Sequence, residues 1–212
     1  MELAEKIKPN HTALVVIDVQ KDFASPDGLC GRHGRDLSQV EPMIENLQRT
    51  ISVAEKAGVP VYYIRQIFDR SKMSPMKLEQ YDIDGNLITC DIETDGWHFY
   101  KLNPPEDQVY TKYNYDAFSI PEFVESLQQK GIKTLVFAGM DTYVCVETAV
   151  RSAFDLGYKV VLPKDLVAGN AKHMDWHERT LALVQKIYGP VVDSSEINQI
   201  WSSIALTEMP QL

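Results

Sequence analysis

Short apolar runs alternate along the chain with longer segments in which apolar residues recur every three or four positions. The short runs, rich in valine, isoleucine and tyrosine, are typical of buried strands, and the longer segments are typical of helices packed against them. This alternation predicts β-α-β units and a largely parallel sheet. The six expected strands are Thr12–Val19, Val59–Ile64, Gln108–Lys112, Thr134–Gly139, Lys159–Pro163 and Pro190–Asp193.

Four helices are expected between these strands, and their ends carry the residues that helix boundaries favour. Proline is favoured in the first turn of a helix, and glycine directly after the last turn. The expected helices begin near Pro42, Pro121, Val146 and Asp175, and the first three end at Gly58, Gly131 and Gly157.

Two segments break this rhythm. Residues 19–37 contain Pro26 and three glycines, and residues 65–107 show only weak periodicity. Loops of this length in a compact domain usually form lids, binding walls or subunit contacts. We therefore expect both segments to border a functional site.

Length and composition place the chain among globular proteins. With 212 residues, of which 44% are apolar and 24% charged, it can bury one core, and we expect a single domain over residues 1–212. The formal charge of −9 opposes binding to nucleic acids and to anionic membranes. Beyond these exclusions, the composition says little about the substrate.

Neither a membrane span nor a disulfide framework is expected. No apolar run approaches the roughly 20 residues that cross a bilayer, and the first residues lack the pattern of a signal peptide, so we expect a cytoplasmic protein. Cys30, Cys90 and Cys145 are odd in number and widely spaced, which argues against disulfides and thiolate metal sites. Cys30 and Cys90 have no partner motif, and we assign them no role.

Three reactive side chains are expected at the edge of the sheet where parallel strands end, which is where such sheets bind ligands. Asp18 follows the apolar core of the first strand, Lys112 ends the third strand, and Cys145 lies just beyond the fourth, at the start of a helix. A helix start and a nearby lysine both favour a thiolate. We interpret the three residues as base, electrostatic partner and nucleophile.

The sequence around these residues resembles the isochorismatase-like cysteine hydrolases. The block G-x-x-T-x-x-C-V matches residues 139–146, D-x-Q-x-x-F matches residues 18–23, and K-x-x-x-x-x-F matches residues 112–118. The order and spacing of the three blocks agree with the family, and the resemblance extends over about Thr12 to Ser194. It implies a three-layer α/β/α, Rossmann-like fold with a six-stranded, mainly parallel sheet of order 3-2-1-4-5-6.

The resemblance also implies a reaction. Asp18 would take the thiol proton, Cys145 would attack an amide or ureido carbonyl, and Lys112 would hold the charges in place. The backbone N–H groups of Asp141 and Cys145 would form the oxyanion hole, with a cis peptide bond between Met140 and Asp141. Ammonia or an amine would leave, and water would hydrolyse the thioester. The family further implies a homo-oligomer, a dimer or a tetramer.

We expect no metal and no cofactor. The nicotinamidase branch of the family carries D-x-H and a second histidine after the second strand, whereas Ile67 and Asp69 stand in that region here and no histidine follows before His98. His173 and His177 are spaced like helical metal ligands, but no third ligand lies near them, so we interpret both as surface residues.

The substrate-binding wall is expected to come from the two long segments and the residues near them. Arg65, Gln66 or Arg70 could bind a carboxylate or carbonyl of the substrate. Aromatic and amide side chains beside the three reactive residues would form the rest. The substrate-binding candidates are Gln20, Phe23, Gln66, Trp97, Tyr113 and Tyr143.

Two alternative functions remain open at this point. On the same fold, isochorismate itself is cleaved at a vinyl ether by members that do without the cysteine, in which case Asp18 and Lys112 act and Cys145 is incidental. A non-catalytic binding protein is the other alternative, although the presence of all three reactive residues argues against a decayed site. The expected function is therefore hydrolysis of a C–N bond in a small amide or ureido (N-carbamoyl) substrate.

Overall fold

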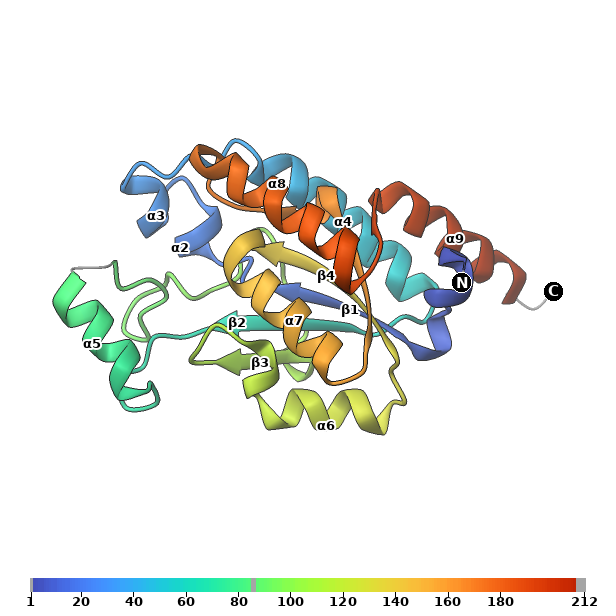
Figure 1. Cartoon of the computed structure of the whole chain (residues 1–212), viewed down its shortest axis with the longest axis horizontal. Helices are drawn as coiled ribbons and strands as arrows, with labels where there is room; N and C mark the ends of the chain where they lie inside the picture. Colours follow the sequence, from blue (N-terminus) through green and yellow to red (C-terminus); the bar gives the residue numbers. More distant parts are fainter. Residues whose placement is uncertain (1, 85–86, 209–212) are drawn as a thin grey trace.

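The computed structural model describes residues 2–84 and 87–208 and contains a parallel sheet with helices on both faces (Figure 1). The main strand order is β3-β2-β1-β4-β5-β7, and the short β6 pairs with the end of β4. The expected α/β class and strand order are confirmed, with β7 in the place of the sixth predicted strand. The strands are β1 (Thr12–Ile17), β2 (Val61–Gln66), β3 (Val109–Lys112), β4 (Thr134–Met140), β5 (Lys159–Pro163), β6 (Val167–Ala168) and β7 (Val191–Val192).

The helices follow the order expected from the sequence, with additions in the long segments and at the C-terminal end. The α-helices are α1 (Leu3–Lys6), α2 (Lys21–Ala24), α3 (Leu29–Arg32), α4 (Val40–Lys56), α5 (Pro75–Asp84), α6 (Pro121–Gln129), α7 (Glu147–Asp155), α8 (Met174–Leu183) and α9 (Ser194–Glu208). The short 3₁₀ turns are η1 (Pro9–His11), η2 (Glu106–Gln108), η3 (Ala117–Ser119), η5 (Lys164–Leu166) and η6 (Ala171–His173). The π-helical turns η4 (Thr142–Val146) and η7 (Val184–Tyr188) precede α7 and follow α8.

The core lies on both faces of the sheet. Every residue of β1 is buried, because alternate side chains point to opposite faces and both faces are covered. Leu14 and Val16 pack in the cluster that contains α4 and α9, whereas Val15 and Ile17 pack in the cluster that contains α6, α7 and part of α8. Figure 1 shows the resulting three layers, with α4 and α9 on one side and α6 and α7 on the other.

Helix α9 was not expected from the sequence. Its residues Ile197 and Trp201 are fully buried in the cluster that includes α4, and the Trp201 indole Nε1 donates a hydrogen bond to the carbonyl of Ile7 at 2.8 Å. The strand β6 was also unexpected, since two residues are too short for a recognisable pattern. In addition, β1 ends at Ile17 rather than Val19, and β2 begins and ends two residues later than predicted.

The two long segments are fastened to each other at the carboxyl edge of the sheet. Asp22, in α2, accepts hydrogen bonds from the backbone N–H of Leu29 at 2.9 Å and from that of Cys90 at 2.7 Å. The second segment also contains α5, which in Figure 1 lies beyond the carboxyl ends of β2 and β3. Residues 19–37, 65–84 and 87–107 therefore form a connected wall over the ends of the strands.

Gly139 is required where β4 approaches β1. Its φ is +114°, and a Cβ at this position would overlap the carbonyl oxygen of Ile17. We expect Gly139→Ala to lower the free energy of unfolding by about 3 kcal/mol, because the energetic cost of the positive φ and that of the steric overlap with the backbone add together. Gly131→Ala is the matched control: φ is +65°, but the new Cβ would meet no atom within 4 Å, so only the conformational cost of about 1 kcal/mol is expected. Urea unfolding of both variants measures the difference, and equal losses would contradict the overlap.

Among residues 2–84 and 87–208, no helix combines the length and apolar character needed to cross a membrane.

Candidate active site

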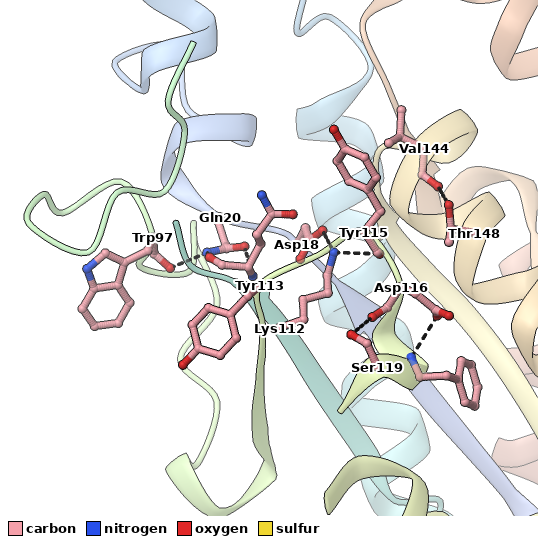
Figure 2. Close-up of polar contacts among 12 residues, drawn as sticks. Asp18, Gln20, Trp97, Lys112, Tyr113, Tyr115, Asp116, Ser119, Val144 and Thr148 are labelled. Atoms are coloured by element: carbon pink, nitrogen blue, oxygen red, sulfur yellow. Dashed lines mark hydrogen bonds and ion pairs between the residues drawn. The ribbon is translucent and has the colours of Figure 1, made fainter. Parts of the chain in front are cut away.

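Asp18 and Lys112 form a buried ion pair at the carboxyl edge of the sheet (Figure 2). Asp18 directly follows β1, and Lys112 is the last residue of β3. The Lys112 ammonium Nζ lies 2.7 Å from Asp18 Oδ2, and the side chains are 0% and 1% exposed. Lys112 Nζ also donates to the carbonyl of Tyr115 at 3.0 Å. The pair is thus removed from solvent and fixed in one orientation.

Cys145 completes the expected group of three. It lies in η4, directly after β4, is 6% exposed and lines a cavity together with Asp18. Its thiol interacts electrostatically with both Asp18 and Lys112. The three residues that the sequence predicts to be reactive are therefore neighbours in space, although they come from three separate strand ends.

Burial is the largest influence on the pKa of the Cys145 thiol and on that of the Asp18 carboxylate. It raises the pKa of the Cys145 thiol, and the opposing effect of the Lys112 charge is smaller. Burial also raises the pKa of Asp18, even though Lys112 acts in the opposite direction. The pKa of Lys112 is raised because Asp18 and Cys145 together outweigh its own burial. The effects expected from the helix start and from Lys112, which favour a thiolate, therefore do not offset the effect of burial on the pKa of the thiol. A carboxylate with a raised pKa is a better acceptor for its proton.

The backbone of Asp18 has an unusual conformation. Its φ is +51°, in the left-handed region that non-glycine residues rarely adopt. Such a residue costs on the order of 1 kcal/mol and persists only when its surroundings hold it there. Here the Asp18 N–H donates to Ile64 at 2.9 Å, and its carbonyl accepts from the N–H of Gln20 at 2.8 Å. These bonds hold the backbone at Asp18, whose carboxylate is paired with Lys112.

The turn that carries Cys145 is held from two sides. The N–H groups of Val144 and Val146 both donate to the carbonyl of Asp141, at 3.0 and 3.1 Å. A ring nitrogen of His177, on α8, is hydrogen-bonded to the Thr142 hydroxyl at 3.0 Å. The interpretation of His177 as a surface residue is thus wrong, because it is buried and supports this turn. The expected cis peptide bond between Met140 and Asp141 is present.

The cavity above the ion pair has a volume of about 140 Å³. Of the six substrate-binding candidates, Phe23 and Gln66 line it. Gln66 is 2% exposed, and its Oε1 has no hydrogen-bond partner among the residues that the structure describes. A buried acceptor without a partner can bind an N–H group of a substrate. The lining residues are Asp18, Phe23, Gln66, Tyr81, Thr89, Tyr115, Met140, Asp141, Val144 and Cys145.

Gln20 is instead a structural residue. Its Nε2 donates to the carbonyls of Gln66 at 2.8 Å and Trp97 at 2.7 Å, and its Oε1 accepts from the N–H of Gln66 at 2.8 Å. Both the nitrogen and the oxygen of the Gln20 side-chain amide therefore have hydrogen-bond partners. Gln20 therefore fastens the loop at Trp97 to the end of β2 and is not brought to the cavity.

The remaining candidates lie outside this cavity. In Figure 2 the Trp97 indole points away from Asp18, and the Arg65 guanidinium lies over it at 5.1 Å. The Tyr113 ring also points away from the ion pair in that view. Tyr143 borders a second, adjacent cavity. The Arg65 guanidinium donates hydrogen bonds to Thr111 and Glu106, and Arg70 lines a different cavity.

Lys77 was not predicted to be near the site. From α5, its ammonium donates to the carbonyl of Tyr113 at 2.9 Å and lies 4.6 Å from the centre of the Tyr115 ring. Burial, together with the charge of Lys112, lowers its pKa to about 8. Tyr81 of α5 lines the cavity itself. These contacts bring α5 over the cavity, and nothing in the weak periodicity of this segment could indicate them.

Within the described ranges 2–84 and 87–208, no group of three or more histidine, cysteine or acidic side chains is arranged to hold a metal ion. His173 stacks on the indole of Trp176, with ring centres 4.5 Å apart, while His177 is hydrogen-bonded to Thr142. The two histidines therefore have separate partners.

Comparisons with known proteins identify the family and the fold of the chain. The isochorismatase domain family model matches residues 12–196. The chain is 32% identical over 179 residues to the ureidoacrylate amidohydrolase RutB of Pseudomonas syringae pv. syringae (strain B728a), covering 76% of this chain and 71% of that protein. It is 29% identical over 210 residues to RutB of Acinetobacter baylyi, covering 90% of this chain and 84% of the relative.

A solved structure has the same fold. The crystal structure of a cysteine hydrolase from Pseudomonas syringae pv. phaseolicola 1448A superposes with a TM-score of 0.80 and 24% sequence identity. The similarity covers 94% of this chain and 96% of that one. The arrangement of the sheet and its helices is therefore shared over nearly the whole length of both proteins.

Proposed function

Because the chain belongs to the isochorismatase family, we propose that it is a cysteine hydrolase that cleaves a C–N bond of a small ureido or amide substrate. The observation that carries this proposal is that a thiol and a carboxylate line one cavity, and that the buried ammonium of Lys112 is paired with that carboxylate. The names of the relatives, which are ureidoacrylate amidohydrolases, support the same reaction class.

In the first half of the reaction, Asp18 accepts the proton of the Cys145 thiol while the sulfur attacks the substrate carbonyl carbon. The new S–C bond places negative charge on the carbonyl oxygen. As the tetrahedral intermediate collapses, the C–N bond breaks and Asp18 returns its proton to the leaving nitrogen. Ammonia or an amine departs, and the acyl or carbamoyl group remains on Cys145 as a thioester.

In the second half, Asp18 accepts a proton from water, and the resulting hydroxide attacks the thioester carbon. The S–C bond breaks, the sulfur takes back the proton from Asp18, and a carboxylic or carbamic acid is released. Lys112 stays protonated throughout and offsets the negative charge that moves between Asp18 and Cys145. The backbone N–H groups of Asp141 and Cys145 are the proposed donors to the oxyanion.

The cavity favours a small, planar head group. A volume of about 140 Å³ is enough for an amide or ureido group but not for a large substrate. Gln66 offers an unpaired Oε1 to a substrate N–H, and Phe23 and Tyr115 border the same space. An N–H donor on the substrate, which a ureido group provides on both sides of its carbonyl, would satisfy this acceptor.

The test is an ammonia and amine release assay over N-carbamoyl amino acids, ureidoacrylate, biuret, nicotinamide and simple amides, with and without a chelator. We expect turnover of at least one ureido or amide substrate that the chelator leaves unchanged. Activity lost with the chelator and restored by added metal would contradict the metal-free mechanism.

The same assay separates the alternative functions. Isochorismate is included as a substrate for the vinyl-ether reaction, and its cleavage without any C–N hydrolysis would replace the proposal by an ether hydrolase. Binding of these compounds without turnover of any would instead indicate a non-catalytic protein on this fold.

A further inference from the structure

A buried lysine that has no part in the proposed mechanism lies beside the active site. Lys77, on α5, is 6% exposed. Its ammonium donates to the carbonyl of Tyr113 at 2.9 Å and lies 4.6 Å from the centre of the Tyr115 ring. An apolar side chain could fill the same place without the cost of taking an ammonium out of water. Packing alone therefore does not account for a charged residue at this position.

The two contacts of Lys77 fall on the turn that also binds the Lys112 ammonium. Tyr113 and Tyr115 lie just after β3. Lys112 Nζ donates to the carbonyl of Tyr115 at 3.0 Å, and in Figure 2 it lies between that carbonyl and Asp18. Lys77 thus binds the turn from α5 while Lys112 binds it from the end of the sheet. A shift of the turn would move the acceptor that holds Lys112 beside Asp18.

The face of α5 that carries Lys77 is also the one that reaches the catalytic cavity. Lys77 and Tyr81 are four residues apart, so they lie on the same face of the helix. Tyr81 lines the cavity, and its ring packs edge-on against that of Phe68 with the ring centres 5.0 Å apart. By contrast, Met76 of the same helix is 70% exposed. The Lys77 ammonium is therefore on the inner side of α5, near the reactive groups.

The charge of Lys77 acts on these reactive groups. The ammonium interacts electrostatically with Asp18, Lys112 and Cys145. Water and salt screen buried charges much less than exposed ones. A nearby positive charge favours the thiolate form of Cys145 over the thiol, which opposes the effect of burial on that thiol. Removal of the Lys77 charge should therefore make the thiol harder to deprotonate.

We propose that Lys77 is a positioning residue of the active site, whose ammonium holds the turn that binds Lys112 and whose positive charge favours loss of the Cys145 proton. This inference rests on the proposed function, in which Cys145 is the nucleophile, and adds a residue outside the group of three. Lys77 acts through these neighbours and does not touch the reacting atoms. Because the effect depends on charge, it is present only while Lys77 is protonated.

The protonation of Lys77 makes its contribution dependent on pH. Burial, followed by the charge of Lys112, lowers the pKa of Lys77 to about 8. Both nearby phenols have raised pKa values and so stay neutral where Lys77 loses its proton. The positive charge is therefore present near neutral pH and absent well above pH 8. The titratable groups around Lys77 are Asp18, Tyr81, Lys112, Tyr115 and Cys145.

The test measures how fast iodoacetamide alkylates Cys145 in the unmodified protein and in Lys77→Met, with peptide mapping to assign the modified cysteine. Alkylation requires the thiolate. At about pH 7 we expect the variant to react about tenfold more slowly, since a neighbouring charge shifts a pKa by about one unit or more. At about pH 9.5, where Lys77 is uncharged, the two rates should agree within about twofold. The ratio of their kcat/KM values should fall over the same pH range.

Lys72→Met is the matched control. Lys72 lies in the same long segment, but its side chain is exposed, and its replacement changes the net charge by the same amount. Since exposed charges are screened, the alkylation rate should stay within about twofold of the unmodified protein at both pH values. Urea unfolding of both variants measures how much of each protein is folded under the assay conditions.

The outcomes separate this inference from the proposed function. Equal alkylation of Lys77→Met and the unmodified protein near neutral pH would overturn the inference. A loss of the same size at both pH values would also overturn it, because it would show that Lys77 only holds α5 in place. Alkylation requires no turnover, so failure to hydrolyse every C–N substrate would overturn the proposed function and leave the result on Lys77 standing.

Discussion

Replacement of Cys145 by alanine is expected to lower kcat for the best ureido or amide substrate by about 10⁴-fold or more. The reason is that the thioester cannot form without the sulfur, and the carbonyl is then attacked only by water. The substrate should still bind, because Gln66 and the rest of the cavity lining are unchanged. Steady-state kinetics with the substrate found in the release assay, together with calorimetric binding to the variant, measure both parts.

The matched control is Cys90→Ala. Cys90 is also a buried cysteine, but it does not line the catalytic cavity, and its sulfur lies 3.8 Å from the carbonyl of Gly96. We expect kcat to stay within about threefold of the unmodified protein, since a buried cysteine outside the site behaves as a small apolar residue. A Cys145→Ala protein that keeps more than a tenth of the activity would contradict the nucleophilic role.

Asp18→Asn is expected to damage both activity and stability. Loss of the general base should lower kcat by about 10²- to 10⁴-fold. The asparagine also leaves the fully buried Lys112 ammonium without a counter-charge, and breaking a buried ion pair in this way costs about 3–5 kcal/mol of unfolding free energy. Urea unfolding and kinetics on the folded fraction measure the two effects separately.

The double variant Asp18→Asn/Lys112→Met distinguishes the effect of Asp18 on activity from its effect on stability. Removing both charges eliminates the unpaired ammonium, so most of the lost stability should return, while activity should stay as low as in the single variant. Recovery of activity along with stability would show that Asp18 matters only for folding. A single variant that unfolds in the same urea concentration as the unmodified protein would contradict the energetic importance of the ion pair.

The strands and the three residues at their ends could be predicted from local pattern, whereas the strand order was implied by the motifs that resemble the isochorismatase-like family. A strand buried on both faces has a continuous apolar run, and the run at residues 12–17 ends directly before Asp18. The motif that runs from Gly139 to Cys145 likewise lies within one short stretch of the sequence. Since parallel strands end at a common edge, residues at strand ends are brought together without any knowledge of the loops.

The lining of the cavity could not be predicted in the same way, because it depends on contacts between distant segments. The amide of Gln20 lies next to a reactive residue in sequence, but it is engaged by backbone groups at Gln66 and Trp97, which are 46 and 77 residues away. Tyr81 of α5, which lines the cavity, could not be predicted because the segment that carries it shows only weak periodicity.

The raised pKa of the Cys145 thiol could not be predicted either, and the reason is again physical. The sequence indicates a helix start and a lysine near Cys145, and both favour a charged sulfur. It does not show that the thiol is 6% exposed, and burial in this case raises the pKa of the thiol by more than Lys112 lowers it. The raised pKa of Asp18 then becomes the relevant property, because in the proposed mechanism this carboxylate accepts the thiol proton.

The central claim is that the substrate's acyl or carbamoyl group is carried on Cys145, and peptide mapping after rapid acid quenching tests it most directly. The enzyme is mixed with an excess of the active substrate, quenched during the first turnover, digested and examined by mass spectrometry. The peptide that contains Cys145 should gain the mass of the acyl or carbamoyl group and lose it once the substrate is consumed. An unmodified Cys145 peptide during a burst of the first product, or the same mass gain on another residue, would contradict the mechanism.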